Sequence, residues 1–121
     1  MNENELSYEI RGCIFNVYNN LGPGLLESAY EAALSYELNK KGLSFGTQVG
    51  LPMMYETLHL DVGYRLDIMV ENKIIIEVKS VEKILPVHHK HVLTYLKLSG
   101  LKLGLLVNFN CEDIAHSIFR R

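Results

Sequence analysis

Residues 63–79 read GYRLDIMVENKIIIEVK, in which two apolar runs are separated by the polar tripeptide Glu71-Asn72-Lys73. Aliphatic and β-branched residues on both sides of a short polar segment are typical of a β-hairpin. Successive side chains of a strand point to opposite faces, so the length of the loop fixes which residues share a face. A three-residue loop places three apolar pairs on one face, namely Val70 with Ile74, Ile68 with Ile76, and Leu66 with Val78.

The same register predicts the other face of the hairpin. Asp67 then lies directly opposite Glu77, and Lys79 lies two residues further along the same strand. A two-residue loop would instead bury Glu77 and Lys73 among the apolar side chains, which is costly for charged groups. The longer loop also suits Asn72, because asparagine tolerates the left-handed backbone that such a loop needs. Apolar packing alone thus brings an aspartate, a glutamate and a lysine together.

These three side chains have the chemistry of a metal-dependent hydrolase. Two carboxylates whose Cβ atoms are roughly 5 Å apart repel one another unless a cation or a proton lies between them. Ligands that are all oxygen suit Mg²⁺ or Mn²⁺, which hold a phosphate oxygen and polarise water. Lys79 would orient or help deprotonate the attacking water, or stabilise charge in the transition state. The alternative is a surface ion-pair network, which would add little to stability.

Two helices are expected before the first strand. The first is amphipathic and runs to about Asn20, with a capping box of Asn2 and Glu5 at its start. Its apolar residues at helical spacing are Leu6, Ile10, Cys13, Val17 and Leu21. Residues 22–24, Gly-Pro-Gly, end this helix, and a second helix is expected to begin there and to run until Gly42.

Strands, a helix and a further strand are expected after residue 42. Residues 43–79 form short runs rich in β-branched and aromatic residues, which predict a meander of three strands. Residues 88–99 return to helical spacing after Pro86 and are ended by Gly100. Residues 102–109 are an apolar run typical of a strand buried on both faces, and residues 112–121 are expected to form a short helix.

This order of elements predicts an α/β fold in which helices flank a mixed central sheet of about four strands, in the order ααβββαβα. The chain has 121 residues, of which 48% are hydrophobic, so we expect one domain with a single core over residues 1–121. The N-terminus is acidic and polar, and no apolar run approaches the ~20 residues that span a bilayer, which predicts a cytoplasmic protein. Cys13 and Cys111 have no metal-like spacing and are expected to be reduced, buried thiols, with a disulfide as the alternative.

The formal net charge of −2 argues against a protein that coats nucleic acid through bulk electrostatics. A phosphate-binding surface must then be local, and residues 79–102 offer one because Glu82 is their only carboxylate. The cationic and titratable residues of this stretch are Lys79, Lys83, Lys90, Lys97, Lys102, His88, His89 and His91. The alternative is that these side chains form an ordinary solvated helix face.

Five motifs, in order, carry a resemblance to a known family. The first, Gly24-Leu-Leu-Glu27-Ser-Ala-Tyr30, reproduces the signature GxxExxY. The others are Gly63-Tyr-Arg-Leu-Asp67, Ile76-Glu77-Val-Lys79, Tyr95-Leu-Lys-Leu-Ser-Gly100 and Lys102-Leu-Gly-Leu-Leu-Val-Asn108-Phe109. With these motifs the chain resembles the GxxExxY family of small prokaryotic proteins, which is placed in the PD-(D/E)xK nuclease superfamily.

The resemblance implies a core of one helix, three antiparallel strands, a crossover helix and a fourth strand, with an acidic site on the central hairpin. It implies that Asp67 and Glu77 are metal ligands, that the Val78 carbonyl is a backbone ligand, and that Lys79 is the catalytic lysine. Glu27 resembles the extra carboxylate that some branches of the superfamily contribute from the first core helix. Tyr30 lies three residues after Glu27, so it either supports this carboxylate or the substrate, or is a core aromatic.

One position departs from the family pattern. Family members carry a glutamine four residues before the tyrosine of the crossover helix, and here His91 stands in that place. His88, His91 and Tyr95 should project from one helix face, where they would contact phosphate or water together with Lys83 and Lys90. The competing interpretation is a zinc site formed by His88, His89 and His91. The expected direction of the His89 side chain, away from the other two, argues against it.

The sequence therefore predicts a Mg²⁺- or Mn²⁺-dependent nuclease that hydrolyses phosphodiester bonds in nucleic acid, with DNA favoured over RNA. The catalytic residues expected are Glu27, Asp67, Glu77, Lys79 and His91. The alternative is a binding or regulatory module that keeps the nuclease fold without turnover, because a chain this short and not basic has few insertions to grip a substrate. A partner subunit or a symmetric homodimer would then complete the substrate channel.

Overall fold

The computed structural model describes residues 1–60 and 63–121 of the chain. Its elements follow in the order α1 (Glu3–Leu21), α2 (Glu27–Lys40), β1 (Phe45–Gly50), β2 (Met53–Tyr55), β3 (Leu58–Leu60), β4 (Arg65–Val70), β5 (Ile74–Lys79), α3 (Pro86–Ser99), β6 (Leu103–Asn108), the 3₁₀ helix η1 (Ile114–His116) and β7 (Ile118–Arg120). Five strands form one sheet in the spatial order β1-β4-β5-β6-β7. Strands β5 and β6 are parallel, and the other neighbours are antiparallel. The predicted α/β class and mixed sheet are confirmed.

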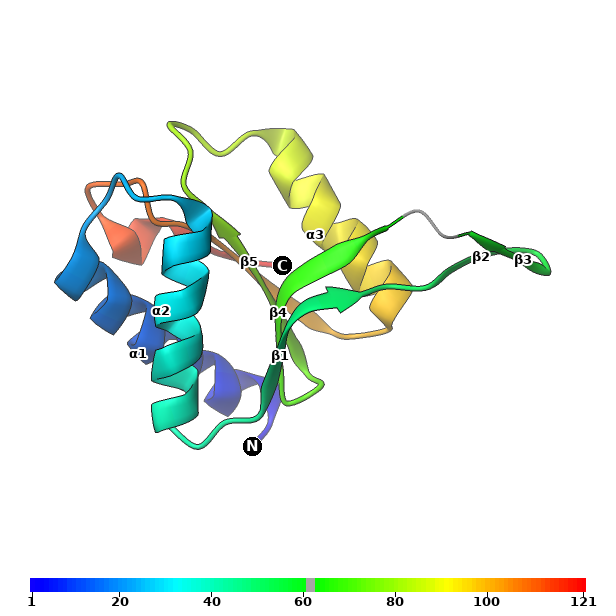
Figure 1. Cartoon of the computed structure of the whole chain (residues 1–121), viewed down its shortest axis with the longest axis horizontal. Coiled ribbons are helices and arrows are strands. Elements are labelled where there is room, and N and C mark those ends of the chain that lie inside the picture. The colour runs from blue at the N-terminus through cyan, green and yellow to red at the C-terminus, as the bar shows by residue number, and fades with distance from the viewer. Residues whose placement is uncertain (61–62) are drawn as a thin grey trace.

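Helices cover both faces of this sheet (Figure 1). Helices α1 and α2 lie on one face and bury the main apolar cluster, which includes Ile10, Leu34, Ile68 and Ile76. Helix α3 lies on the other face and connects the parallel strands β5 and β6. A second, smaller cluster lies on that face, with Ile75 at its centre and residues of α3 packed against it. Every residue of β6 is buried, as predicted for a strand covered on both faces.

The hairpin of β4 and β5 has the predicted register. Ile68 pairs with Ile76 and Val70 with Ile74, and the Lys73 amide closes the turn on the Val70 carbonyl at 2.9 Å. The turn residues have left-handed backbones, with φ of 54° at residue 71 and 52° at residue 72. Loop parity was therefore sufficient to predict the pairing of residues 68–70 with residues 74–76.

Leu66 was expected on the main core face opposite Val78, and this prediction is wrong. Leu66 is fully buried, but it belongs to the second cluster with Leu51 and Ile75. In the ladder of β1 and β4, Thr47 pairs with Ile68 and the next pair is Val49 with Leu66. The intervening residue of β1, at position 48, has a left-handed backbone, and Val49 beyond it also packs against the second cluster.

Three further expectations about elements are corrected. Helix α2 begins at Glu27 rather than at residues 22–24, because the backbones of Gly22 and Gly24 have φ of 67° and 97°. Residues 43–79 contain a separate two-stranded hairpin, β2 and β3, besides the three strands of the main sheet. This hairpin projects beyond the sheet (Figure 1). Residues 112–121 form η1 and β7 rather than a helix.

Both cysteines are free thiols, with Cys13 buried and Cys111 half-buried. Helix α1 has the predicted capping box, in which Glu5 N donates to Asn2 Oδ1 at 2.8 Å and Asn2 N donates to Glu5 Oε1 at 3.2 Å. Within residues 1–60 and 63–121, no helix has the length and apolar character needed to cross a lipid bilayer.

Candidate active site

The side chains of Asp67 and Glu77 lie against one another between β4 and β5. Asp67 N donates to Glu77 Oε1 at 3.3 Å, and Val78 N donates to Asp67 Oδ2 at 2.8 Å. These bonds follow the last regular ladder pair, Ile68 with Ile76. The two carboxylates thus occupy the place where the strands of the hairpin begin to separate.

Glu77 is buried, with 5% of its surface exposed. Burial chiefly, and then the neighbouring Asp67 carboxylate, raise the pKa of Glu77 to about 8, while Lys79 acts in the opposite direction. A buried, proton-binding carboxyl group beside a second acid does not fit a surface ion-pair network. The arrangement instead favours binding of a cation or a proton.

Lys79 and Glu27 lie at the end of β5. Lys79 is the half-buried last residue of the strand. Glu27 is exposed in the first turn of α2, where its Oε2 accepts a hydrogen bond from Ser80 N at 2.9 Å. Ser80 Oγ also donates to the Leu25 carbonyl at 2.6 Å. These contacts fix the start of α2 against the strand end that carries Lys79.

Two residues near Asp67 were missed by the sequence analysis. Gln48 Nε2 donates to both carboxylate oxygens of Glu31, at 3.2 and 3.1 Å, and lies 3.4 Å from Asp67 Oδ1. Burial, followed by the effect of Asp67, raises the pKa of Glu31, while the hydrogen bond from Gln48 lowers it. Glu31 lies four residues after Glu27 on the same helix face, which is a signal that the sequence did offer. Gln48 had no comparable signal.

Tyr30 is a core residue rather than a substrate-binding residue. Its side chain is fully buried and stacks on Phe109, with ring centroids 4.4 Å apart and planes inclined by 6°. Its hydroxyl donates to the Gly22 carbonyl at 2.5 Å and accepts from Leu25 N at 3.1 Å. Tyr30 therefore holds the segment before α2, and its side chain is out of reach of a nucleic acid.

Helix α3 places Tyr95 near the carboxylates and His91 next to Tyr95. The two rings lie together, with centroids 6.5 Å apart. Tyr95 is half-buried, and burial together with the nearby Glu77 and Asp67 carboxylates raises its pKa. His91 is therefore adjacent to an aromatic ring of the site.

The other predicted substrate-binding residues lie near the start of α3. His88 Nδ1 accepts a hydrogen bond from Leu85 N at 2.9 Å, so one ring nitrogen caps the helix. Lys83 and Lys90 are exposed. His89 lies against β7, where its Nδ1 accepts from Arg121 Nε at 3.0 Å and its ring meets that of Phe119 edge-on.

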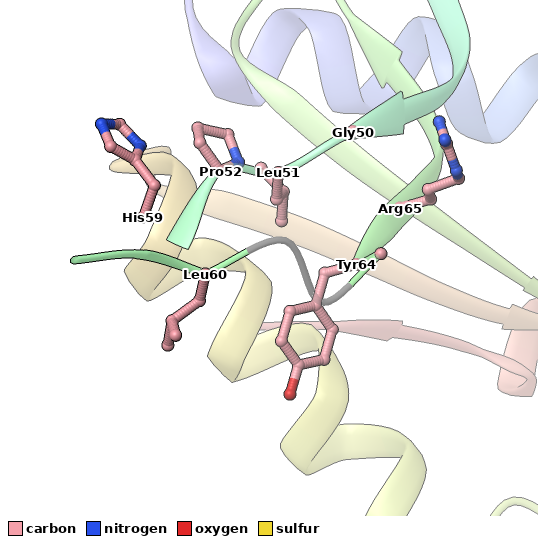
Figure 2. A pocket seen from close by; sticks show the side chains of 8 residues that line it. Gly50, Leu51, Pro52, His59, Leu60, Tyr64 and Arg65 are labelled. Atoms are coloured by element: carbon pink, nitrogen blue, oxygen red, sulfur yellow. The ribbon is translucent and has the colours of Figure 1, made fainter. Parts of the chain in front are cut away.

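A cavity of about 320 Å³ lies where the β2–β3 hairpin leaves the sheet. Figure 2 shows Tyr64 and Arg65 at its edge, pointing in opposite directions. The Tyr64 ring is 6.4 Å from that of Tyr95, and Arg65 Nη1 donates to the Gln48 carbonyl at 3.3 Å. The cavity is therefore adjacent to the carboxylate site rather than over it.

The donor set at Asp67 and Glu77 is compatible with a hard divalent cation. Mg²⁺ is commonly bound through one or two carboxylates and keeps several waters or substrate oxygens, so two adjacent carboxylates suffice. Their mutual repulsion and the burial of Glu77 would both be relieved by a positive charge. In the part of the chain that the structure describes, no group of three or more histidine, cysteine, aspartate or glutamate side chains converges on one metal-sized site.

Comparison with known proteins identifies the family. The model of the PD-(D/E)XK nuclease superfamily matches residues 4–121, almost the whole chain. The chain belongs to the PD-(D/E)XK nuclease superfamily. Glu77-Val78-Lys79 has the form (D/E)XK, and Asp67 is the preceding aspartate, with Leu66 where the name of the superfamily has proline.

Membership of the PD-(D/E)XK superfamily indicates a nuclease and therefore a nucleic-acid substrate. Nucleases of this superfamily generally use divalent metal ions. A search of curated proteins and a search of solved structures found no match to the chain.

Proposed function

We propose that this chain is a metal-dependent nuclease of the GxxExxY type that hydrolyses phosphodiester bonds, with DNA as its first expected substrate and Mg²⁺ or Mn²⁺ as its cofactor. The observation that carries the proposal is the contact between Asp67 and Glu77 beside Lys79, inside a fold of the nuclease superfamily. Paired carboxylates next to a lysine match the chemistry that phosphodiester hydrolysis needs.

Each residue of the site has a role in this proposal. Asp67 and Glu77 would hold the cation together with the Val78 carbonyl, and Glu27 would approach from the helix side. A bound Mg²⁺ or Mn²⁺ supplies positive charge that neutralises the two carboxylates and the scissile phosphate. The Lys79 ammonium would orient the attacking water and stabilise negative charge on the phosphate in the transition state.

Substrate contacts would come from α3 and the loop before it. Tyr95 lies near the carboxylates and His91 lies next to Tyr95, so both would contact the phosphate or a base next to the scissile bond. Phosphates further along the nucleic-acid strand would be bound by His88, Lys83 and Lys90. These side chains suit that role because they have few acidic neighbours in the sequence. This local surface accounts for nucleic-acid binding by a chain whose net charge is −2.

Cleavage assays with matched variants test the proposal. Purified protein is incubated with duplex, single-stranded and branched DNA, and with RNA, in Mg²⁺, Mn²⁺ or EDTA. We expect metal-dependent cleavage that falls about a hundredfold or more in Asp67→Asn and in Lys79→Met, because each removes one charged group of the site at similar size. Glu56→Gln, at the exposed turn between β2 and β3, should cleave at the wild-type rate.

Two results would count against this assignment. Absence of cleavage of every substrate in both metals would remove the activity itself. Wild-type rates in Asp67→Asn and Lys79→Met would place the active site elsewhere. Circular dichroism of each variant should match that of the wild type, so that a lost activity reports chemistry rather than unfolding.

A catalytically silent binding module is the second candidate function. The observation that favours it is the net charge of −2, together with the small number of carboxylates at the site. In this case a second subunit of a homodimer would complete the substrate channel, and electrophoretic shift assays would show binding to nucleic acid without cleavage in Mn²⁺. Cleavage by the wild type that depends on Lys79 would exclude it.

A further inference from the structure

Gln48 has a left-handed backbone conformation, which is unusual for a residue within a strand. Four non-glycine residues in the described part of the chain have positive φ. Three of them lie in the tight turns of the two hairpins, where left-handed residues are ordinary, and these are Glu56, Glu71 and Asn72. Gln48 has φ of 50° inside β1, where an extended backbone is the norm. An outlier of this kind suggests a functional constraint at residue 48.

The side chain of Gln48 contacts two carboxylates, those of Glu31 and Asp67. Its Nε2 donates to Glu31 at 3.1 and 3.2 Å and lies 3.4 Å from Asp67 Oδ1. Its own carbonyl accepts from Arg65 Nη1 at 3.3 Å, which supports the unusual backbone from the neighbouring strand. One amide thus contacts a helix carboxylate and a strand carboxylate that are separated by 36 residues of chain.

Asp67 is oriented by two donors, one for each carboxylate oxygen. Val78 N donates to Oδ2 at 2.8 Å, and Gln48 Nε2 approaches Oδ1 at 3.4 Å. A carboxylate held at both oxygens cannot rotate freely about its terminal bond, so its remaining lone pairs keep a fixed direction. The amide also supplies a positive dipole between Asp67 and Glu31, which reduces their repulsion.

We propose that Gln48 is a positioning residue, whose amide fixes the Asp67 carboxylate for metal binding and connects it to Glu31. This inference rests on the proposed metal-dependent function. The strained backbone at residue 48 is retained because a regular strand would direct this side chain elsewhere. Gln48 acts through Asp67 and is not itself a ligand of the metal.

Two substitutions at residue 48 separate the effect of the side-chain amide from the effect of the backbone conformation. Gln48→Gly removes the amide and relieves the left-handed strain, whereas Gln48→Met removes the amide and keeps a side chain of similar length. Glu56→Gly is the matched control, because Glu56 has φ of 55° but lies in the exposed turn between β2 and β3. Calorimetric titration with Mn²⁺ gives the metal affinity, and thermal melting without metal gives the stability.

We expect both Gln48 variants to bind Mn²⁺ about tenfold more weakly or worse, as is typical when an outer hydrogen bond to a metal ligand is removed. Gln48→Gly should also melt at a higher temperature than the wild type, so that affinity falls while stability rises. A purely structural role for Gln48 predicts the reverse, a loss of stability with unchanged affinity. Glu56→Gly should keep the wild-type affinity.

The outcomes distinguish this inference from the proposed function. If the wild type binds Mn²⁺ and either Gln48 variant binds it within twofold of the wild type, the positioning role is wrong and the metal site stands. If the wild type does not bind Mn²⁺, both proposals are wrong. If Glu56→Gly loses affinity as much as the Gln48 variants do, the effect is not local to the site and the inference fails.

Discussion

Glu77 is the residue at which the site departs most clearly from ordinary solution chemistry. Its burial, and then its contact with Asp67, raise its pKa from 4.5 to about 8. Between these two values the folded protein keeps a proton that the unfolded chain has released. The free energy of unfolding of the metal-free protein must therefore fall as the pH rises through this window.

Glu77→Gln should remove this dependence, because glutamine has nearly the same shape and does not titrate. Near pH 4 both proteins carry a neutral group at residue 77, and their free energies of unfolding should agree within about 0.5 kcal/mol. At pH 9 the variant should be more stable than the wild type by roughly 1–3 kcal/mol, since only the wild type must then bury a charge. Urea unfolding in EDTA at both pH values measures the difference.

A control for this experiment is Glu56→Gln, at an exposed turn position, which should follow the wild type at both pH values. If the difference in stability between the wild type and Glu77→Gln is the same at pH 4 and at pH 9, the raised pKa of Glu77 is contradicted.

The residues of the site differ in how far sequence could predict them. The apposition of Asp67 and Glu77 follows from strand alternation and loop length, which are local quantities. Gln48 reaches the site because β1 pairs with β4, which no local pattern states, whereas Glu31 shares a helix face with Glu27. The sequence alone is compatible with Tyr30 either in the site or in the core. Its burial against Phe109 shows that it is a core residue.

At the scale of elements, α3 packs tightly against β6 at Gly104. A Cβ atom at this position would lie 2.6 Å from Val92 Cγ1, a distance that requires the neighbouring atoms to move. Val92 is fully buried between the helix and the sheet. The absence of a side chain at residue 104 therefore allows the helix that carries Tyr95 and His91 to sit close to the sheet.

Gly104→Ala should destabilise the protein by about 1–3 kcal/mol, because an added methyl group in a packed interior forces side chains and backbone apart. Gly12→Ala is the matched control: Gly12 lies within α1, and a Cβ there meets nothing within 4 Å. Alanine favours helix over glycine, so this control should gain up to about 1 kcal/mol. Denaturant unfolding of the two variants should shift in opposite directions, and equal shifts would refute the close approach.

The C-terminal segment shows why an element prediction failed. Residues 112–121 are compatible with a short helix by local pattern, but β6 has an edge whose backbone groups need partners. Ile118 pairs with Val107 and Phe119 with Leu106, so the segment satisfies that edge as β7. Long-range pairing here outweighs local propensity, because strand preference depends on context.

At the scale of the whole molecule, helices cover both faces of the sheet (Figure 1). Within this fold the buried Glu77 and the half-buried Asp67 lie together where β4 and β5 separate. Two neighbouring acids destabilise the folded state unless their charge is compensated. A cation that binds the two acids in the folded state, but not in the unfolded chain, must stabilise the whole fold.

Mn²⁺ at about a hundred times its dissociation constant should add about 2.7 kcal/mol to the free energy of unfolding of the wild type at pH 8. Asp67→Asn should lose most of this gain, since one of the two anionic ligands becomes neutral. Thermal and urea unfolding with Mn²⁺ or EDTA measure the effect. Equal stabilisation of the wild type and Asp67→Asn would show that Mn²⁺ binds elsewhere.

The sequence by itself determined the α/β class, the order of the main helices and strands, and the apposition of Asp67 and Glu77. It did so because a strand alternates its faces every residue and a short loop allows a single parity. Tertiary structure alone decided the position of Leu66, the pairing of β7 and the presence of Gln48 at the site. These depend on which distant segments pair and pack, and the free energy of such contacts is gained only when the chain is folded.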